Sequence, residues 1–88
     1  MNIKNKKNLN AAAASIEMSP GEMIRELRTL KGWSQTDLAK ATGISQTNIS
    51  ALENERIEIG KQRAIVIATA LGVHPASIMF ADYKVAAA

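Results

Sequence analysis

The sequence has no cysteine, only two prolines, a single histidine and no long apolar run. The absence of cysteine excludes disulfides and cysteine-based metal sites, and it is compatible with a reducing compartment. No apolar run approaches the roughly 18 residues that a membrane-spanning helix requires. No apolar core follows the charged start, so we expect no signal peptide. These absences predict a cytoplasmic protein, and the length suits one domain.

The same scarcity argues against catalysis. His74 precedes Pro75 and is better explained as a helix cap than as a general base, and there is no second histidine and no cysteine nucleophile. Glu53, Glu55 and Glu58 lack the mixed spacing expected of metal ligands. We therefore expect no catalytic residues, no metal and no cofactor.

The net charge of +3 comes from the ends of the chain. The segment 20–83 carries seven Lys or Arg and seven Asp or Glu, so it is neutral. Residues 1–19 carry three Lys and one Glu, and Lys84 supplies the remaining positive charge. The basic pI is therefore weak evidence for nucleic-acid binding, because the field depends on where the charges lie.

Composition divides the chain into a mobile N-terminal tail over residues 1–18, a folded domain over 19–81 and a C-terminal tail over 82–88. Within the domain, capping residues and glycines delimit short apolar stretches with helical spacing, and no segment has convincing strand alternation. The sequence therefore predicts a compact all-α domain of five short helices. They begin at Ser19, Ser34, Ser45, Gly60 and Pro75, and end at Gly32, Gly43, Asn54, Gly72 and Phe80.

The same spacing predicts which side chains form the core. The inward positions are Met23, Ile24, Leu27, Leu30, Leu38, Ala39, Ile49, Leu52, Ile65, Ala68 and Leu71. Ile57 and Ile59, in the loop before the fourth helix, are expected to plug the core. Trp33 is expected to cover it between the first and second helices.

Gly43, Ile44 and Ser45 separate the second and third predicted helices. Two short helices joined by a glycine turn form a helix-turn-helix arrangement. Gly43 can adopt the positive φ that the sharp reversal requires, and Ile44 turns back into the core. We therefore expect the third helix to stand out from the body as a ridge that fits the major groove of DNA.

The outer face of the third helix has almost no charge. It carries Gln46, Thr47, Ser50 and Ala51, with Asn48 at its edge. Glutamine can pair bidentately with adenine, the threonine methyl and alanine can contact the thymine methyl, and serine can contact either partner. An ordinary polar surface is the alternative, but such surfaces usually carry Lys and Glu. Next to the turn, we interpret the four residues as base readers.

Two helix starts are predicted phosphate sites. Gln35 lies at the start of the second helix, where free backbone N–H groups point outward. Lys61 and Arg63 lie in the first turn of the fourth helix, where the helix dipole disfavours cations. A bound phosphate would resolve that conflict, and Asn54 and Arg56 lie just upstream to help. The alternatives are a simple surface glutamine and a solvated lysine.

Arg28 and Glu53 lie on the edges of the inward faces of the first and third predicted helices. If these helices pack together, the two side chains meet in a partly buried salt bridge that orients the third helix without contacting DNA. The alternative is two unconnected surface charges, which contribute only about 0–1 kcal/mol.

Five segments closely resemble the lambda-repressor-like, Xre-type DNA-binding domains. They are Ile24-Arg25-Glu26-Leu27-Arg28, Trp33-Ser34-Gln35-Thr36-Asp37-Leu38-Ala39, Gly43-Ile44-Ser45-Gln46, Ile49-Ser50-Ala51-Leu52-Glu53-Asn54 and Ala70-Leu71-Gly72-Val73. The resemblance covers roughly Pro20 to Phe80 and implies a five-helix all-α fold. It implies phosphate contact by Gln35, base reading by Gln46, Thr47 and Ser50, and the Arg28–Glu53 pair. Ala51 stands where many members carry a longer polar reader, which leaves the number of specified base pairs open.

The resemblance implies a sequence-specific regulator that binds double-stranded DNA and associates with the bacterial nucleoid. We expect a repressor that acts as a homodimer on a palindromic operator. One reading helix with neutral contacts covers few bases, and two copies roughly 34 Å apart double that number. The segment Ile78–Tyr83 is the expected dimer contact.

A second resemblance keeps another function open. The segments 58–64 and 70–80 look like Xre-type antitoxins, which bind a small ribonuclease-type toxin and repress their own operon. In that case the N-terminal segment or Tyr83–Ala88 would order on the toxin. A purely protein-binding adaptor on the same fold is a further alternative, and it would lack salt-dependent DNA affinity.

Overall fold

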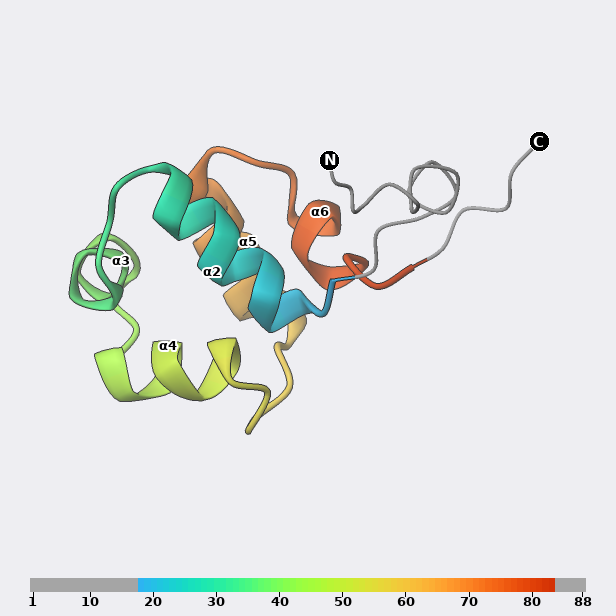
Figure 1. Ribbon diagram of the computed structural model, residues 1–88, viewed down its shortest axis with the longest axis horizontal. Helices are drawn as coiled ribbons and strands as arrows, with labels where there is room; N and C mark the ends of the chain where they lie inside the picture. The colour runs from blue at the N-terminus through green and yellow to red at the C-terminus, as the bar shows by residue number, and fades with distance from the viewer. Residues whose placement is uncertain (1–17, 84–88) are drawn as a thin grey trace, which may run out of the picture.

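The computed structural model describes residues 18–83, which form five α-helices and no strand (Figure 1). The helices are α2 (Pro20–Leu30), α3 (Gln35–Thr42), α4 (Gln46–Glu53), α5 (Lys61–Leu71) and α6 (Pro75–Met79). The predicted all-α class is therefore confirmed. The predicted tail of residues 1–18 lies outside the described residues except for Met18, and so does the segment 84–88. None of the helices within 18–83 combines the length and the apolar character needed to cross a membrane.

Serine side chains begin three of the helices, as predicted. Ser19, Ser34 and Ser45 each accept a hydrogen bond from the backbone N–H three residues later, at 3.0–3.1 Å. In α2 and α3 the acidic side chain at that third position bonds back to the serine N–H and closes a capping box. Gly43 and Gly72 end α3 and α5 in the left-handed conformation. Each serine cap stabilises its helix by about 1 kcal/mol, so these local signals fix the helix boundaries.

One hydrophobic core joins the five helices. Its buried side chains are Ile24, Leu38, Ile49, Leu52, Ile67, Ala68, Leu71 and Ile78. The helix α5 packs against α6 and α3, and α2 packs against α4 and α6. In Figure 1, α2 crosses in front of α5, while α4 lies along the lower edge of the body. One side of α4 therefore faces the core and the other faces solvent.

Two of the core positions predicted before α5 are wrong. Leu30 is 73 % exposed. In a helix with 3.6 residues per turn, each spacing of three residues rotates the side chain by about 60° around the axis. Leu30, two such spacings after Ile24, therefore points away from the buried face of α2. Ile57 is also exposed, whereas Ile59 packs against the core as expected.

One of the three inward positions predicted for α5 is wrong, while Ala68 and Leu71 are buried as predicted. The buried residues of this helix are Ala64, Ile67, Ala68 and Leu71, while Ile65 is 41 % exposed. Ile65 lies about 100° around the helix from Ala64. Ala64 takes the buried position that side-chain hydrophobicity assigned to Ile65, so hydrophobicity alone selects the wrong residue.

Candidate nucleic-acid interface

The turn between α3 and α4 has the predicted geometry. Gly43 adopts a φ of 78°, in the left-handed region that favours glycine. The Thr42 hydroxyl donates to the Leu38 carbonyl at 2.8 Å and accepts from the Ile44 N–H at 3.1 Å. Ile44 packs against the core. The turn is thus fixed by its own hydrogen bonds and by a buried side chain, and it holds α4 against α3.

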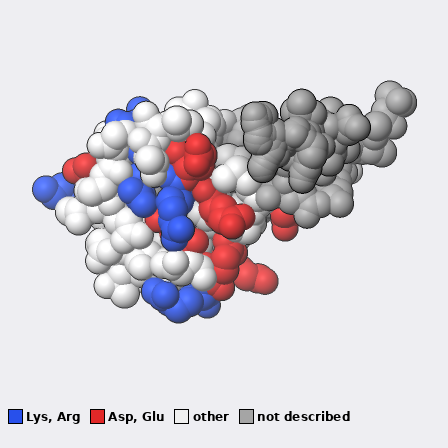
Figure 2. All heavy atoms as spheres, in the orientation of Figure 1, with Lys and Arg blue, Asp and Glu red and all other residues white. Residues whose placement is uncertain are grey.

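The solvent-facing side of α4 carries the predicted base-reading residues. Gln46 and Thr47 are exposed, while Ser50 and Ala51 are half-buried one turn further along. The surface over α4 is mostly uncharged in Figure 2, with positive groups only at its lower edge. Negative groups gather instead on the side toward α2 and the loop after α4 (Figure 2). A neutral ridge of amide, hydroxyl and methyl groups is therefore accessible from outside.

A chain of hydrogen bonds runs from the buried Glu53 through Gln35 to Gln46, the first of the predicted base-reading residues. The Gln35 Nε2 donates to Glu53 Oε1 at 3.0 Å, and the Gln46 Nε2 donates to Gln35 Oε1 at 2.6 Å. A carboxylate only accepts, so Gln35 must turn its NH₂ toward Glu53 and its carbonyl toward Gln46. The NH₂ of Gln46 must then face Gln35. This leaves Gln46 with a carbonyl oxygen and one N–H that are free to meet a ligand.

Glu53 anchors this chain. Its side chain is fully buried, and Arg28 binds it bidentately, Nε to Oε2 at 2.7 Å and Nη2 to Oε1 at 2.9 Å. Arg25 adds a longer contact to Oε1 at 3.4 Å. Arg28 also donates to the Trp33 carbonyl at 2.8 Å. The structure thus joins the predicted pair of Arg28 and Glu53 and connects it to Gln35.

The network shifts the pKa values of both charged groups. Burial raises the pKa of the Glu53 carboxyl, but the hydrogen bonds from Arg28 and Gln35 outweigh it, so the pKa lies below its ordinary value. The hydrogen bond with Glu53 raises the pKa of Arg28 further. Both groups are therefore charged at neutral pH, which is the state that the geometry requires.

Apart from Gln35 at the start of α3, the predicted phosphate-binding residues fall into two places. Arg56 and Asn54 gather at Ser50, whose hydroxyl lies 3.5 Å from Arg56 Nη2 and 3.3 Å from Asn54 Nδ2. Lys61 is exposed at the first position of α5, and Arg63 is half-buried in the same turn. No side chain caps this helix start. The backbone N–H groups of the first turn of α5 therefore have no side-chain partner at the cap.

Two functional contacts are absent from the sequence-based expectations. Arg25 donates to Asn54 Oδ1 at 3.0 Å as well as to Glu53, so the amide of Asn54 is engaged on both sides. Arg25 precedes Arg28 by three residues and therefore lies on the same face of α2, which could have indicated a contact with Glu53 and Asn54. The carboxylate of Glu55 bonds to the start of α2. No sequence pattern indicated that contact, because it depends on a backbone conformation that Glu rarely adopts.

The single histidine caps α6 as predicted, since His74 Nδ1 accepts a hydrogen bond from the Ala76 N–H at 3.0 Å. Within residues 18–83, no three His, Cys, Asp or Glu side chains cluster in a way that would hold a metal ion.

Comparisons with known proteins agree with this geometry. Residues 24–78, more than half of the chain, match the sequence profile of the helix-turn-helix family. A curated relative, the Neisseria hypothetical transcription factor from Neisseria meningitidis serogroup B, is 42 % identical over 50 residues, which are 57 % of this chain. This chain spans about half, 47 %, of the length of that relative.

Solved structures have the same arrangement of helices. The restriction-modification controller protein C.AhdI from Aeromonas hydrophila matches with a TM-score of 0.65 at 32 % identity, over 67 % of this chain and 89 % of that one. The P22 c2 repressor in complex with a synthetic operator matches with a TM-score of 0.69 at 28 % identity, over 74 % of this chain and 98 % of that one. The family consists of DNA-binding regulators and not of enzymes. This protein belongs to the helix-turn-helix family of lambda-repressor-like, Xre-type transcription regulators, which bind double-stranded DNA.

Proposed function

We propose that the protein is a repressor that binds a palindromic operator as a homodimer and reads bases with α4. The observation that carries the proposal is the fixed orientation of the Gln46 amide. Its free carbonyl oxygen accepts from the adenine N6 amino group, and its free N–H donates to adenine N7. Guanine presents only acceptors at this edge, so the same orientation disfavours it. Thr47, Ser50 and Ala51 extend the reading to neighbouring bases.

Phosphate contacts would fix the register of α4 on the duplex. The second N–H of Gln35 remains for a phosphate at the start of α3. Arg56 and Asn54 lie at the other end of α4, and Lys61 and Arg63 lie at the uncapped start of α5. Anions favour a helix start with free N–H groups. Arg56 reaches a phosphate without breaking a buried contact, whereas the Nδ2 of Asn54, the donor that a phosphate needs, must first release Ser50.

In vitro selection from random duplexes tests this function. The full chain is expected to enrich an inverted repeat with an A·T pair at the same place in each half, and half-site centres about 34 Å apart. The likeness to the P22 c2 repressor, which was solved with an operator, supports this design. Enrichment of no sequence over several rounds would refute the proposal. The absence of any salt-dependent affinity for DNA would favour the adaptor alternative.

The proposed homodimer contact lies at α6 and the residues that follow it. Ile78 is fully buried, so within the segment Ile78–Tyr83 the contact falls to Phe80 and Tyr83, which are 59 % and 70 % exposed. Replacing both with serine is expected to give a monomer in analytical ultracentrifugation and weaker operator binding. Leu30→Ser, at an equally exposed apolar site, is the matched control. A wild-type protein that is monomeric both free and on its operator would refute the dimer.

The antitoxin function remains the second candidate, because the exposed Phe80 and Tyr83 also suit a protein partner. It predicts that a neighbouring gene encodes a small ribonuclease that co-purifies with this chain and is inhibited by it. A stand-alone repressor has no such neighbour. Capture of that gene product, with loss of its ribonuclease activity, would favour the antitoxin.

A further inference from the structure

Glu55 has an unusual backbone for its residue type. It is the one non-glycine residue within 18–83 with a positive φ, at 62°. This left-handed region favours glycine and, less strongly, asparagine, because a Cβ crowds the neighbouring carbonyl. Strained residues of this kind persist where the surrounding structure holds them in place.

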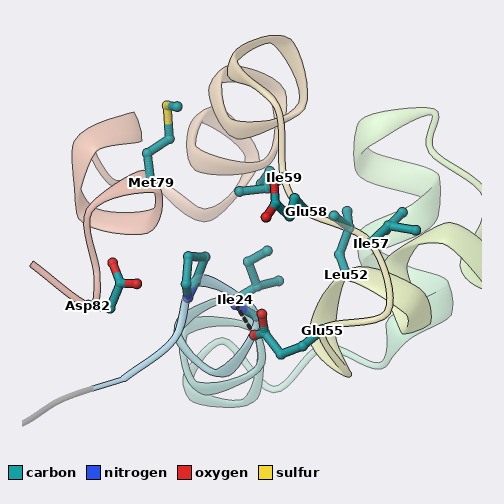
Figure 3. Close-up of a pocket in the computed structure, with 10 residues that line it drawn as sticks. Ile24, Leu52, Glu55, Ile57, Glu58, Ile59, Met79 and Asp82 are labelled. Atoms are coloured by element: carbon teal, nitrogen blue, oxygen red, sulfur yellow. Dashed lines mark hydrogen bonds between the residues drawn. The ribbon is translucent and has the colours of Figure 1, made fainter.

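The side chain of Glu55 explains why this conformation is held. Its Oε2 accepts a hydrogen bond from the Gly21 N–H at 2.8 Å and another from the Ser19 hydroxyl. Figure 3 shows the carboxylate directed at the start of α2, beside Ile24 and Leu52. The first N–H groups of a helix lack partners within the helix and attract negative charge. The residue that follows α4 by two positions therefore caps α2.

Gly21 lets the two elements approach closely. A Cβ on this glycine would overlap the Leu52 carbonyl oxygen and Glu55 Oε2, and it would lie 2.8 Å from the Glu53 carbonyl oxygen. The first turn of α2 thus lies directly on the last carbonyl groups of α4. Any other residue at position 21 would have to push the C-terminal end of α4 away from α2.

We propose that Glu55 and Gly21 act as a clasp that sets the orientation of α4 against α2, which makes Glu55 a positioning residue for DNA recognition. The helix has only 8 residues, so a displacement at its end carries through to Ser50 and Gln46. Arg28 holds the last residue of α4 through the side chain of Glu53, and the clasp holds the backbone that follows it. The effect on DNA rests on the proposed function, whereas the effect on helix orientation does not.

The variant Glu55→Gly separates positioning from stability. Glycine removes the carboxylate but accepts the positive φ without strain, so the two effects on the free energy of unfolding oppose each other. We expect an unfolding midpoint close to that of the wild type. The ratio of affinities for the wild-type-selected duplex and a scrambled duplex of the same composition should fall about fivefold, because a base-reading helix tolerates little displacement.

A control accounts for the lost negative charge. Glu55 and Glu58 line one groove at the start of α2 (Figure 3). Glu58→Ala removes a carboxylate from the same loop, and Glu58 makes no hydrogen bond to α2. Both variants should raise affinity for the scrambled duplex slightly, but only Glu55→Gly should lower discrimination. Equal discrimination in the wild type and Glu55→Gly would overturn the proposal. A fall in stability with unchanged discrimination would also overturn it, because Glu55 would then be structural alone.

A DNA-free measurement distinguishes this inference from the proposed function. Residual dipolar couplings report the angle between α2 and α4 in the full chain. In Glu55→Gly we expect this angle to change while each helix stays intact, and an unchanged angle would overturn the clasp. If the wild type selects no duplex but the angle changes, the proposed function fails and the clasp stands. In Gly21→Ala/Glu55→Gly the angle should change more, because the new Cβ still meets the Leu52 carbonyl.

Discussion

The two ends of α4 are held by different chemistry. At the C-terminal end, the buried carboxylate of Glu53 meets two arginines, and Glu55 caps α2. At the N-terminal end, Gln46 is held by one hydrogen bond between neutral amides, to Gln35, which in turn donates to Glu53. Charged groups in a buried setting are costly to separate, whereas the amide pair at the surface orients Gln46 and leaves its carbonyl oxygen and one N–H unoccupied. The C-terminal end thus anchors the helix, and the N-terminal end remains available for a base.

Removal of the anchor should have the largest effect. Glu53→Ala leaves Arg28 without its partner in a site where the arginine side chain is only 13 % exposed. Breaking a buried pair by deleting one partner destabilises a fold by about 3–5 kcal/mol. We expect a loss of that size in the free energy of unfolding, measured by urea denaturation. Glu26→Ala, an exposed glutamate on α2, should change it by less than about 0.5 kcal/mol. A similar effect for the two variants would contradict the anchoring role.

The anchor should also make stability depend on pH. The pKa of Glu53 is lower in the folded state than its ordinary value of 4.5, so the unfolded chain binds more protons between the two values. The stability contributed by Glu53 is present above about pH 4.5 and is lost as the pH falls through the folded pKa. Asp37, whose pKa is lowered by the hydrogen bond from the Ser34 N–H, adds a loss of the same sign.

The variant Glu53→Gln isolates the contribution of Glu53 to the pH dependence of stability. The difference in unfolding free energy between wild type and variant should shrink as the pH falls from 6 toward 3, measured by urea denaturation at each pH. The contribution of Asp37 cancels in this difference. A difference that stays constant across the range would show that the charge of Glu53 does not stabilise the fold.

Substitution at the N-terminal end of α4 should have the opposite effect, with little change in stability and a large change in DNA affinity. Gln46→Ala is expected to leave stability within about 0.5 kcal/mol, because the side chain is exposed. Affinity for the selected operator should fall by about 1–3 kcal/mol, and the base preference should relax at one position. Fluorescence anisotropy at fixed salt measures both affinities. Equal losses on operator and scrambled duplexes would mean that Gln46 does not read a base.

The sequence predicted the helix boundaries well because they depend on local chemistry. Ser34 with Asp37 three residues later, and Gly43 at the end, place α3 without reference to the rest of the molecule. The predicted core failed where distant packing decides. Leu30 and Ile65 are hydrophobic enough to be buried, but Leu30 has rotated off the buried face of α2, and in α5 Ala64 is buried where Ile65 is exposed.

The candidate site shows the same division. Arg28 and Glu53 were paired from their positions on two inward helix faces, and they lie in contact. The link from Glu53 through Gln35 to Gln46 was not foreseen, since the three residues come from two helices and the chain of amides depends on their relative placement. The role of Glu55 could not be predicted from the sequence, because neither its positive φ nor its hydrogen bond to Gly21 follows from neighbouring residues.

The smallest effect is expected at the C-terminal end of α4, where the proposed DNA contact is with phosphate. Arg56→Ala should weaken binding to operator and scrambled duplexes alike, because a phosphate carries no sequence information. The slope of log affinity against log salt should fall in magnitude by about one, since one phosphate contact releases about one counterion. Lys40→Ala, at an exposed lysine beside Trp33 and Asp37, is the charge-matched control and should leave the slope unchanged. A loss confined to the operator would instead make Arg56 a base reader, and the contrast between the specific and unspecific ends of α4 would disappear.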